Sequence, residues 1–367
     1  MKITRVSAYQ VDLPFDHGTY KLSGGRTWTS LDSTIVRIDT DAGITGWGET
    51  CPFGPNYVEA FAEGARAGIK LLAPDLLGLD PSQPAAVCYQ MDRLMLGHPY
   101  VKHGIDMACW DIMGKSAGMP LYRLMGGMRT PSPRTSGWIP PETGERMDEL
   151  LAHHRANNTR MFSTKASGNA EKDMAFLDEL ASLMQTGESV KVDANGGWRV
   201  DEAIRIMNHS RALDAYFEQP CETYEECRTV YQATGRPQTL DETALTLQDI
   251  VRAFNDGVCH SLNLKIGRVG GLTPALAIRN TCSALGIPMH IQCAGGNQLT
   301  QAAIVHLAHS TPTNRLLYIW DIGDVVSFST VTNPLRDDAG TMVAHDAPGL
   351  GVEVDESVIG EPVFEID

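Results

Sequence analysis

The chain contains Val190-Lys191-Val192-Asp193, Ala215-Tyr216-Phe217-Glu218 and Thr239-Leu240-Asp241, three short apolar runs that each end in a carboxylate. The acids lie about 24 residues apart, a spacing typical of successive βα units in a barrel. Because the carboxyl ends of barrel strands meet at the face that holds the active site, we expect the three acids to share one site.

Carboxylate oxygens are ligands that Mg²⁺ prefers, so Asp193, Glu218 and Asp241 predict an octahedral magnesium site. Small or polar residues follow each acid, Asn195 among them, as expected where strands open onto a cavity. Any single acid could instead be a solvated loop residue or a helix N-cap. The shared period argues against that alternative for all three together.

Two lysines, Lys165 and Lys265, end apolar runs in neighbouring units. An ammonium group in an apolar strand is costly without a partner or a purpose, which leaves an ion pair to a metal-binding acid or acid/base catalysis. The second and sixth strands of a barrel lie on opposite sides. We therefore predict that the two amines approach a bound substrate from opposite faces and are catalytic.

The domain organisation is indicated by a change in the order of strand and helix patterns along the chain. Residues 1–127 have strand patterns followed by helical ones, which predicts an α+β domain. Residues 128–325 alternate strand and helix, and Thr273-Pro274 predicts one helix start. Residues 326–367 are rich in loops and are expected to pack back on the first domain. The predicted strands of the middle region are 133–139, 160–167, 189–195, 215–220, 238–243, 260–267, 288–293 and 315–321.

This pattern predicts an α/β fold with a TIM-like barrel, and an open doubly wound sheet is the alternative.

The net charge of −15 argues against nucleic acid or an anionic membrane as a partner. The eight cysteines form no Cys-x-x-Cys pair and lie mostly in apolar segments, so we expect free thiols in a reducing compartment. The N-terminal residues alternate like a strand, and we predict a soluble, cytoplasmic protein.

The acids and lysines together resemble the site of the enolase superfamily. The segment 105–115, followed by Gly118, Pro120 and Gly126-Gly127, is similar to the linker between capping domain and barrel in the mandelate racemase and muconate lactonizing branch. The resemblance implies an α+β capping domain, a modified (β/α)7β barrel, Mg²⁺ at the three acids, and abstraction of a proton α to a carboxylate.

The chain departs from the family pattern at two positions. The family often has Lys-x-Lys on the second strand, whereas this chain has Ser163 before Lys165. On the seventh strand Gln292 stands where mandelate racemase-like members carry a base histidine, and His290 is interpreted as a structural residue of the barrel. Two-lysine chemistry is therefore favoured over a histidine base.

Substrate contacts are predicted at the barrel mouth. Trp320 ends the eighth strand, where it either packs in the core or makes a cation–π contact to a substrate ammonium. The loops that carry Ser23 and Tyr57 resemble those of superfamily members acting on proline derivatives. Gln292 and Asn195 complete the predicted substrate contacts.

We therefore predict a Mg²⁺-dependent dehydratase of cis-3-hydroxy-L-proline that forms Δ¹-pyrroline-2-carboxylate. The alternatives are 2-epimerisation of proline, 4-hydroxyproline or their betaines, dehydration of acid sugars, and a barrel that binds a carboxylate without turnover. The expected partners are a small carboxylate and, in a homo-oligomer, further copies of the chain.

Overall fold

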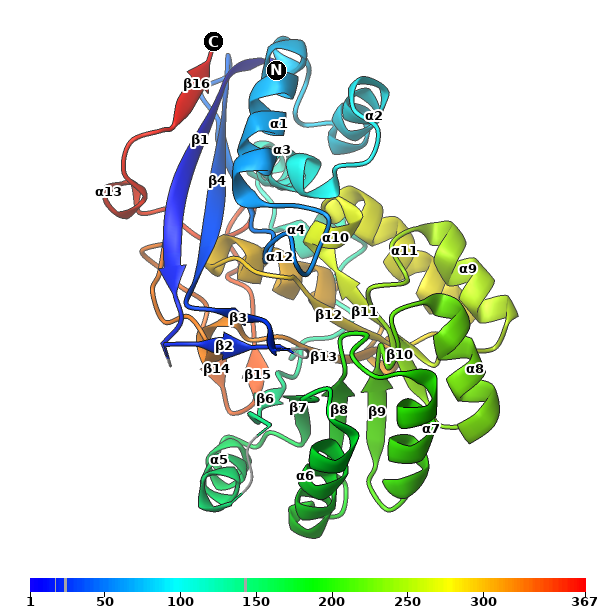
Figure 1. Ribbon diagram of the computed structural model, residues 1–367. Coiled ribbons are helices and arrows are strands. Elements are labelled where there is room, and N and C mark those ends of the chain that lie inside the picture. The colour runs from blue at the N-terminus through cyan, green and yellow to red at the C-terminus, as the bar shows by residue number, and fades with distance from the viewer. Residues whose placement is uncertain (17, 23–24, 142–143) are drawn as a thin grey trace.

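The computed structural model describes residues 1–16, 18–22, 25–141 and 144–367. Its N-terminal part is a capping domain built on an antiparallel sheet, and its larger part is a parallel barrel (Figure 1). The predicted α/β fold with a barrel and an α+β cap is confirmed, and the open-sheet alternative is wrong.

The cap sheet joins the two ends of the chain. Its strand order is β16-β1-β4-β5, and the C-terminal strand pairs antiparallel with β1 through Val6 and Ile366 (Figure 1). The bounds are β1 Ile3–Pro14, β4 Ser30–Thr40, β5 Thr45–Thr50 and β16 Phe364–Ile366.

Three long helices and a fourth, short one follow the cap strands. The third, α3, is buried along most of its length because it packs against β4 and β5 and against the barrel helices α10 and α11. A Cβ atom at Gly48 would lie 2.0 Å from the Gly104 carbonyl oxygen, so β5 and α3 approach closely only without a side chain there. The helices are α1 Ala62–Leu76, α2 Pro84–Leu94, α3 Pro99–Ala117 and the short α4 Leu121–Leu124.

The barrel has eight parallel strands in sequential order from β6 to β13. The circle closes where the Ser136 N–H donates to the Ile319 carbonyl (3.2 Å) and the Ile319 N–H donates to the Arg134 carbonyl (2.8 Å). The strands are β6 Gly137–Trp138, β7 Met161–Lys165, β8 Ser189–Asp193, β9 Ala215–Glu218, β10 Gln238–Leu240, β11 Ser261–Lys265, β12 Met289–Gln292 and β13 Leu316–Ile319.

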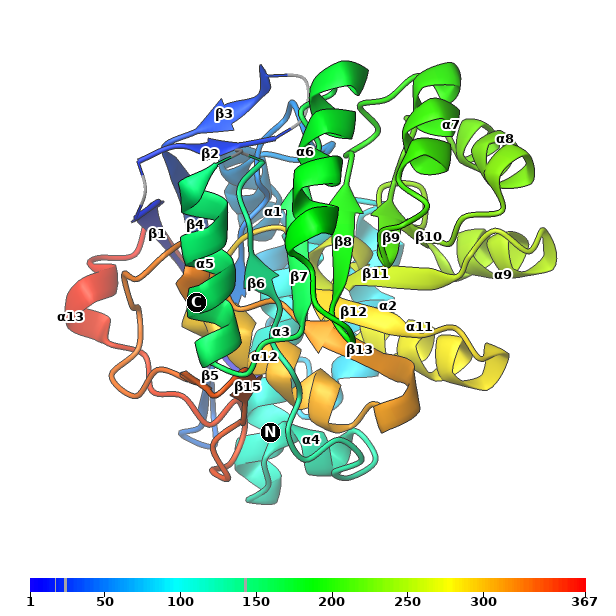
Figure 2. The same ribbon diagram turned by 90° about the horizontal axis from the view of Figure 1, so that it is seen from below.

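Helices connect successive strands and surround them in the view from below (Figure 2). Thr223 and Thr246 cap α8 and α9 through capping boxes, which satisfy backbone N–H groups in the first turn. The helices are α5 Glu145–Ala156, α6 Ala170–Leu183, α7 Val200–His209, α8 Tyr224–Thr234, α9 Leu247–Asn255, α10 Ile266–Val269, α11 Leu272–Leu285 and α12 Gln298–His309.

Each barrel strand lies within its predicted range but is shorter than predicted. Two of the differences in bounds, one in a strand and one in a helix, have an identifiable cause. The first barrel strand is shorter than predicted because Pro133 and Pro140 lack the N–H that a central strand donates. Helix α11 begins at Leu272, before Thr273, and Asp106 of α3 accepts a hydrogen bond from the Thr273 N–H (3.0 Å). The side chain that caps the N-terminus of α11 therefore comes from the cap, whereas the sequence pattern predicted Thr273 as the start of the helix.

Short elements complete the chain. The hairpin β2–β3 lies over the barrel mouth, and β14 pairs with β15 next to Arg134. These elements are β2 Tyr20–Lys21, β3 Thr27–Trp28, η2 Thr313–Arg315, η3 Ile322–Asp324, β14 Asp337–Asp338, β15 Thr341–Met342 and α13 Glu356–Ile359.

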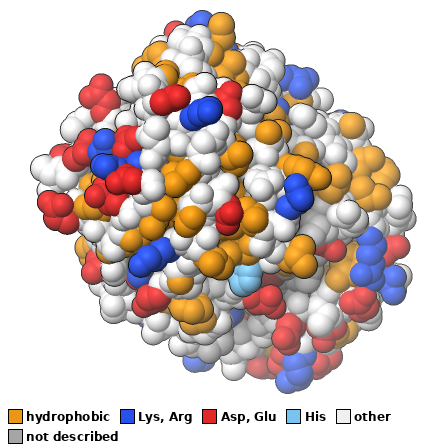
Figure 3. Space-filling view, turned by 90° about the horizontal axis from the view of Figure 1, so that it is seen from above, with side chains coloured by type: hydrophobic (Ala, Val, Ile, Leu, Met, Phe, Trp, Pro, Cys, Tyr) orange, Lys and Arg blue, Asp and Glu red, His pale blue; other side chains and the backbone are white. Residues whose placement is uncertain are grey.

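The surface of the cap mixes hydrophobic, acidic and basic side chains (Figure 3). Scattered exposed hydrophobic residues are normal on a globular surface.

All eight cysteines are free, as predicted, and six of them are buried. In the described ranges no helix has the length and apolarity needed to cross a bilayer.

Candidate active site

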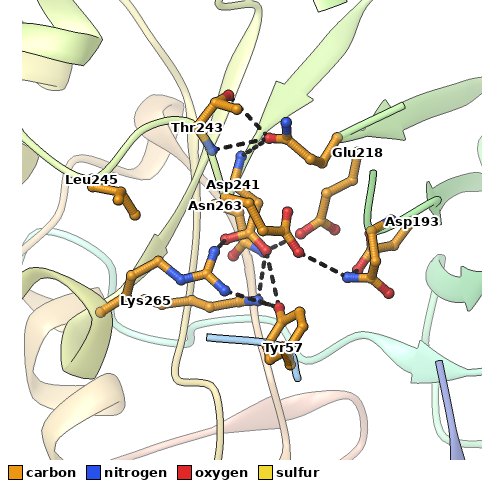
Figure 4. Close-up of polar contacts among 12 residues, drawn as sticks. Tyr57, Asp193, Glu218, Asp241, Thr243, Leu245, Asn263 and Lys265 are labelled. Atoms are coloured by element: carbon orange, nitrogen blue, oxygen red, sulfur yellow. Dashed lines mark hydrogen bonds and ion pairs between the residues drawn. The ribbon is translucent and has the colours of Figure 1, made fainter. Parts of the chain in front are cut away.

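The three predicted acids lie together at the carboxyl ends of neighbouring strands. Asp193 ends β8, Glu218 ends β9 and Asp241 directly follows β10. All three are at most 2% exposed, and Figure 4 shows their side chains converging near Lys265 and Tyr57. Burial of three carboxylates in one place requires positive charge nearby.

Cationic side chains supply that charge in the structure. The Lys165 ammonium contacts Asp193 at 2.5 Å, and Lys191 contacts Glu218. Asp241 accepts hydrogen bonds from Lys265 (2.6 Å) and Arg268. In the described ranges, no three His, Cys, Asp or Glu side chains are arranged so that they could hold a metal ion together.

The pKa values of the acids reflect burial and these neighbours. Burial, and next the charge of Asp193, raise the pKa of Glu218 to about 7. Burial also raises the pKa of Asp241, but the charges of Arg268 and Lys265 outweigh it and hold that pKa below its usual range. Burial and a neighbouring like charge therefore disfavour the ionised form of Glu218, whereas two cations favour that of Asp241.

The oxygen atoms around the acids fit a hard cation. Three buried oxygens beside the acids accept no hydrogen bond from the described part of the chain, one each from Asn195, Glu242 and Asn263. Native structures rarely leave such atoms without a partner, and Mg²⁺ takes oxygen ligands. Oxygen donors of the kind that Mg²⁺ takes are therefore present beside the acids, and Asp193, Glu218 and Asp241 as its ligands stay a prediction.

The two predicted lysines flank one cavity from opposite sides. Lys165 ends β7, the second barrel strand, and Lys265 ends β11, the sixth, and both line a cavity of about 60 Å³. Burial lowers the pKa of Lys165, but the charges of Asp193, Tyr20 and Glu218 and the hydrogen bond to Asp193 together outweigh burial and raise it above the ordinary value. As placed, Lys165 therefore carries a proton.

Tyr57 brings the cap into the site. Its hydroxyl oxygen accepts hydrogen bonds from Lys265 (2.7 Å) and Arg268 (2.9 Å) and lies 3.5 Å from Asp241 (Figure 4). Burial raises the pKa of Tyr57 well above its usual value, so the phenol is neutral. One cap residue thus orients the amine predicted to act on the substrate.

The other predicted contacts fall in different places. Trp320 and Gln292 line the cavity. Asn195 instead links two acids, since its side-chain amide donates to Asp193 (3.0 Å) and Glu242 (3.1 Å). Ser23 lies outside the described residues.

His290 is fully buried inside the barrel against Tyr318, with ring centroids 4.2 Å apart. Burial lowers its pKa well below the usual value, so the ring is neutral. It is absent from the residues that line the cavity, among those the structure describes.

Five residues of the site were missed in the sequence: Lys191, Glu242, Asn263, Arg268 and Asp324. Lys191 and Asn263 lie two residues before Asp193 and Lys265, on the same strand face, so period-2 alternation was a usable signal. The other three follow strand ends in loops or short helices, where no periodicity marks them.

Two family models match the chain. Residues 21–126 match the N-terminal domain of mandelate racemase / muconate lactonizing enzyme, and residues 145–358 match the enolase C-terminal domain-like family. The chain belongs to the enolase superfamily. The resemblance predicted from the acids and lysines is thereby confirmed.

Two relatives match this chain over nearly its whole length. It is 39% identical to a cis-3-hydroxy-L-proline dehydratase of Roseibium aggregatum over 99% of both chains. It is 24% identical to an N-succinyl-L-Arg/Lys racemase of Bacillus cereus over 98% of both chains. The prediction that the chain is an enzyme is confirmed.

A solved structure of an enolase superfamily member from Roseovarius nubinhibens, in complex with magnesium, superimposes with a TM-score of 0.93 at 40% identity. The match covers 100% of this chain and 99% of that one. Magnesium binding therefore occurs in a relative of the same fold and length.

Proposed function

We propose that the protein dehydrates cis-3-hydroxy-L-proline to Δ¹-pyrroline-2-carboxylate in a Mg²⁺-dependent reaction. The observation that carries the proposal is the pair Lys165 and Lys265 on opposite sides of one cavity. The end-to-end similarity to a dehydratase of that substrate supports the same conclusion.

Asp193, Glu218 and Asp241 are the proposed metal ligands. Bound there, Mg²⁺ would supply positive charge that competes with the Lys165 ammonium for Asp193 and offsets the charge growing on the substrate carboxylate. Lys165 would then be able to act as a neutral base, because its ammonium would lose the carboxylate that retains the proton.

The two lysines divide the chemistry between the faces of the ring. In cis-3-hydroxy-L-proline the hydroxyl lies anti to the α proton. The Lys165 amine takes the α proton, the freed electron pair forms the C2–C3 double bond, and the C3–O bond breaks. Lys265 donates a proton to the leaving hydroxyl, which departs as water, and the resulting enamine gains a proton at C3 as it loses one from nitrogen.

Proton NMR in D₂O with MgCl₂ tests the proposal. We expect cis-3-hydroxy-L-proline to lose its C2 proton and its 3-hydroxyl together, with the pyrroline carboxylate as product. Lys165→Met should lower kcat by about 10²- to 10⁴-fold, the usual contribution of a general base. Lys172→Met, on the exposed face of α6, is the matched control, and an unchanged substrate spectrum with the wild-type protein would refute the reaction.

A second candidate is 2-epimerisation of proline, 4-hydroxyproline or their betaines. It is favoured by the racemase among the relatives, and it needs only that both lysines exchange the α proton. The same NMR experiment with L-proline separates the two functions. Deuterium at C2 with loss of optical activity indicates an epimerase.

A further inference from the structure

The barrel geometry places the substrate ring opposite the acids. The acids lie on β8 to β10, the third to fifth strands, and β13, the eighth strand, is across the barrel from β9. A substrate whose carboxylate faces the acids and whose α carbon lies between the two lysines therefore directs its ring toward β13. The residues after β13 are then the ones that meet the ring nitrogen.

That end of the cavity is aromatic. Tyr20 stacks on Trp138 with centroids 5.7 Å apart, Phe53 lies 5.5 Å from Tyr20, and Trp320 follows β13. Aromatic walls suit a ring and attract a cation, but they offer an N–H group no strong hydrogen-bond acceptor.

Asp324 is the carboxylate at this end. It ends η3 and lines the cavity, whereas the acidic cavity residue at the other end, Asp193, is engaged by Lys165. Among the residues that the structure describes, no lysine, arginine or histidine forms an ion pair with Asp324. Burial, and next the charge of Asp321, raise the pKa of Asp324 to about 8, which marks a carboxylate that lacks a cation.

We propose that Asp324 binds the ring ammonium of the substrate and accepts a hydrogen bond from its N–H. The inference rests on the proposed function and adds its substrate class: imino acids with a secondary ammonium, in preference to N,N-dimethyl betaines, which have no N–H to donate. A site built to bind an N–H group rejects analogues that lack it, because the buried acceptor is left unpaired.

Calorimetric titration in the presence of Mg²⁺, with ligands that lack a 3-hydroxyl and so cannot be dehydrated, tests this assignment. The probes are L-proline and tetrahydrofuran-2-carboxylate, whose ring has the same size with oxygen in place of the ammonium. We expect the wild-type protein to bind L-proline about 10- to 100-fold more tightly than the ether acid. Asp324→Asn should remove most of that preference by weakening proline binding while the ether acid binds within about threefold of wild type.

Asp321→Asn is the matched control. It changes a neighbouring carboxylate that is not among the cavity-lining residues, and asparagine retains the hydrogen bond that Asp321 accepts from the Gly323 N–H (2.8 Å). Its preference for L-proline should equal that of the wild type. In turnover of cis-3-hydroxy-L-proline, Asp324→Asn should raise KM by a similar factor with kcat within about threefold.

The outcomes separate this inference from the function. Wild-type protein that prefers L-proline, with the preference retained in Asp324→Asn, overturns the role of Asp324 and leaves the dehydratase intact. Wild-type protein that binds neither ring overturns the proposed function and the inference with it. A thermal melt confirms that both variants are folded.

Discussion

Ser163 and Lys191 lie side by side on β7 and β8, because the parallel register pairs these two positions. The family motif often carries a lysine at the place of Ser163. In this chain an ammonium reaches the same level of the barrel from the adjacent strand, where it contacts Glu218 and lies 5.7 Å from the centre of the Tyr318 ring. This chain therefore has a buried ammonium at that level on β8, next to Ser163 of β7.

Removing that charge should destabilise the barrel. Lys191→Met leaves Glu218, which is fully buried, without its ammonium partner, and breaking a buried pair costs about 3–5 kcal/mol. Urea unfolding in EDTA measures the loss of unfolding free energy. Lys172→Met should change it by less than about 0.5 kcal/mol.

A second substitution tests whether an ammonium on the neighbouring strand can stabilise Glu218 in place of Lys191. The double variant Ser163→Lys/Lys191→Met returns an ammonium to the neighbouring strand at the same level, and we expect it to recover a large part of the lost stability. A Lys191→Met protein as stable as the wild type would show that Glu218 needs no cation.

The acids and lysines at the strand ends were easier to recognise in the sequence than most other residues of the site, for a physical reason. Asp193 and Lys265 stand out because a charge at the end of an apolar run has few structural explanations. Lys191 is a charge inside such a run and is explained only by its partner Glu218, which is 27 residues away in sequence and adjacent only after folding. Asp324 follows the last strand, so its place in the cavity depends on how the chain turns after β13.

Two barrel helices begin at carboxylates that the cap supplies. Glu49 of β5 accepts hydrogen bonds from the N–H groups of Asn297 (2.8 Å) and Thr300 (3.1 Å) at the start of α12. Asp106 of α3 does the same at Thr273 in α11. Because unpaired N–H groups and the helix dipole make a helix N-terminus attractive to anions, these contacts fix the cap on the barrel.

The sequence pattern predicted an alternation of strands and helices in the barrel, but not these contacts between the cap and the barrel helices. A capping residue is recognised when it directly precedes its helix, as Thr223 and Thr246 do. Glu49 and Asp106 act on helices more than 150 residues further along the chain, and no local pattern links them to those helices.

Asp106 should make stability depend on pH. Burial raises its pKa to about 7 in the folded protein, whereas an unfolded aspartate titrates near 3.9. The unfolded state therefore ionises first, and the contribution of this group to stability falls as pH rises from about 4 to 7. Asp106→Asn removes that titration, so its stability relative to wild type should rise by about 2–3 kcal/mol between pH 5 and pH 8.

Urea unfolding at the two pH values measures this difference. Asp148→Asn, at an exposed position of α5, provides the control for general effects of removing a negative charge. A difference between Asp106→Asn and wild type that stays constant across the range would mean that Asp106 is ionised in the folded protein at pH 5.

The hydrophobic cores join the cap and the barrel into one unit. One cluster of buried residues includes Leu13 of β1 and Trp47 of β5 from the cap together with Ile291 of β12 and Leu299 of α12 from the barrel. A second cluster fills the side of the barrel around β7 to β9, and a third lies between the cap sheet and its helices. The cap and half of the barrel therefore bury their apolar surface against each other.

This shared core predicts that cap and barrel unfold together. Leu13→Ala and Ile291→Ala each remove a fully buried side chain and should cost about 2–5 kcal/mol. Because both lie in the same cluster, each variant should shift one and the same calorimetric transition, with equal calorimetric and van't Hoff enthalpies. Two transitions, one lowered by Leu13→Ala and the other by Ile291→Ala, would show instead that the capping domain and the barrel are independent folding units that merely meet at Tyr57 and the two helix caps.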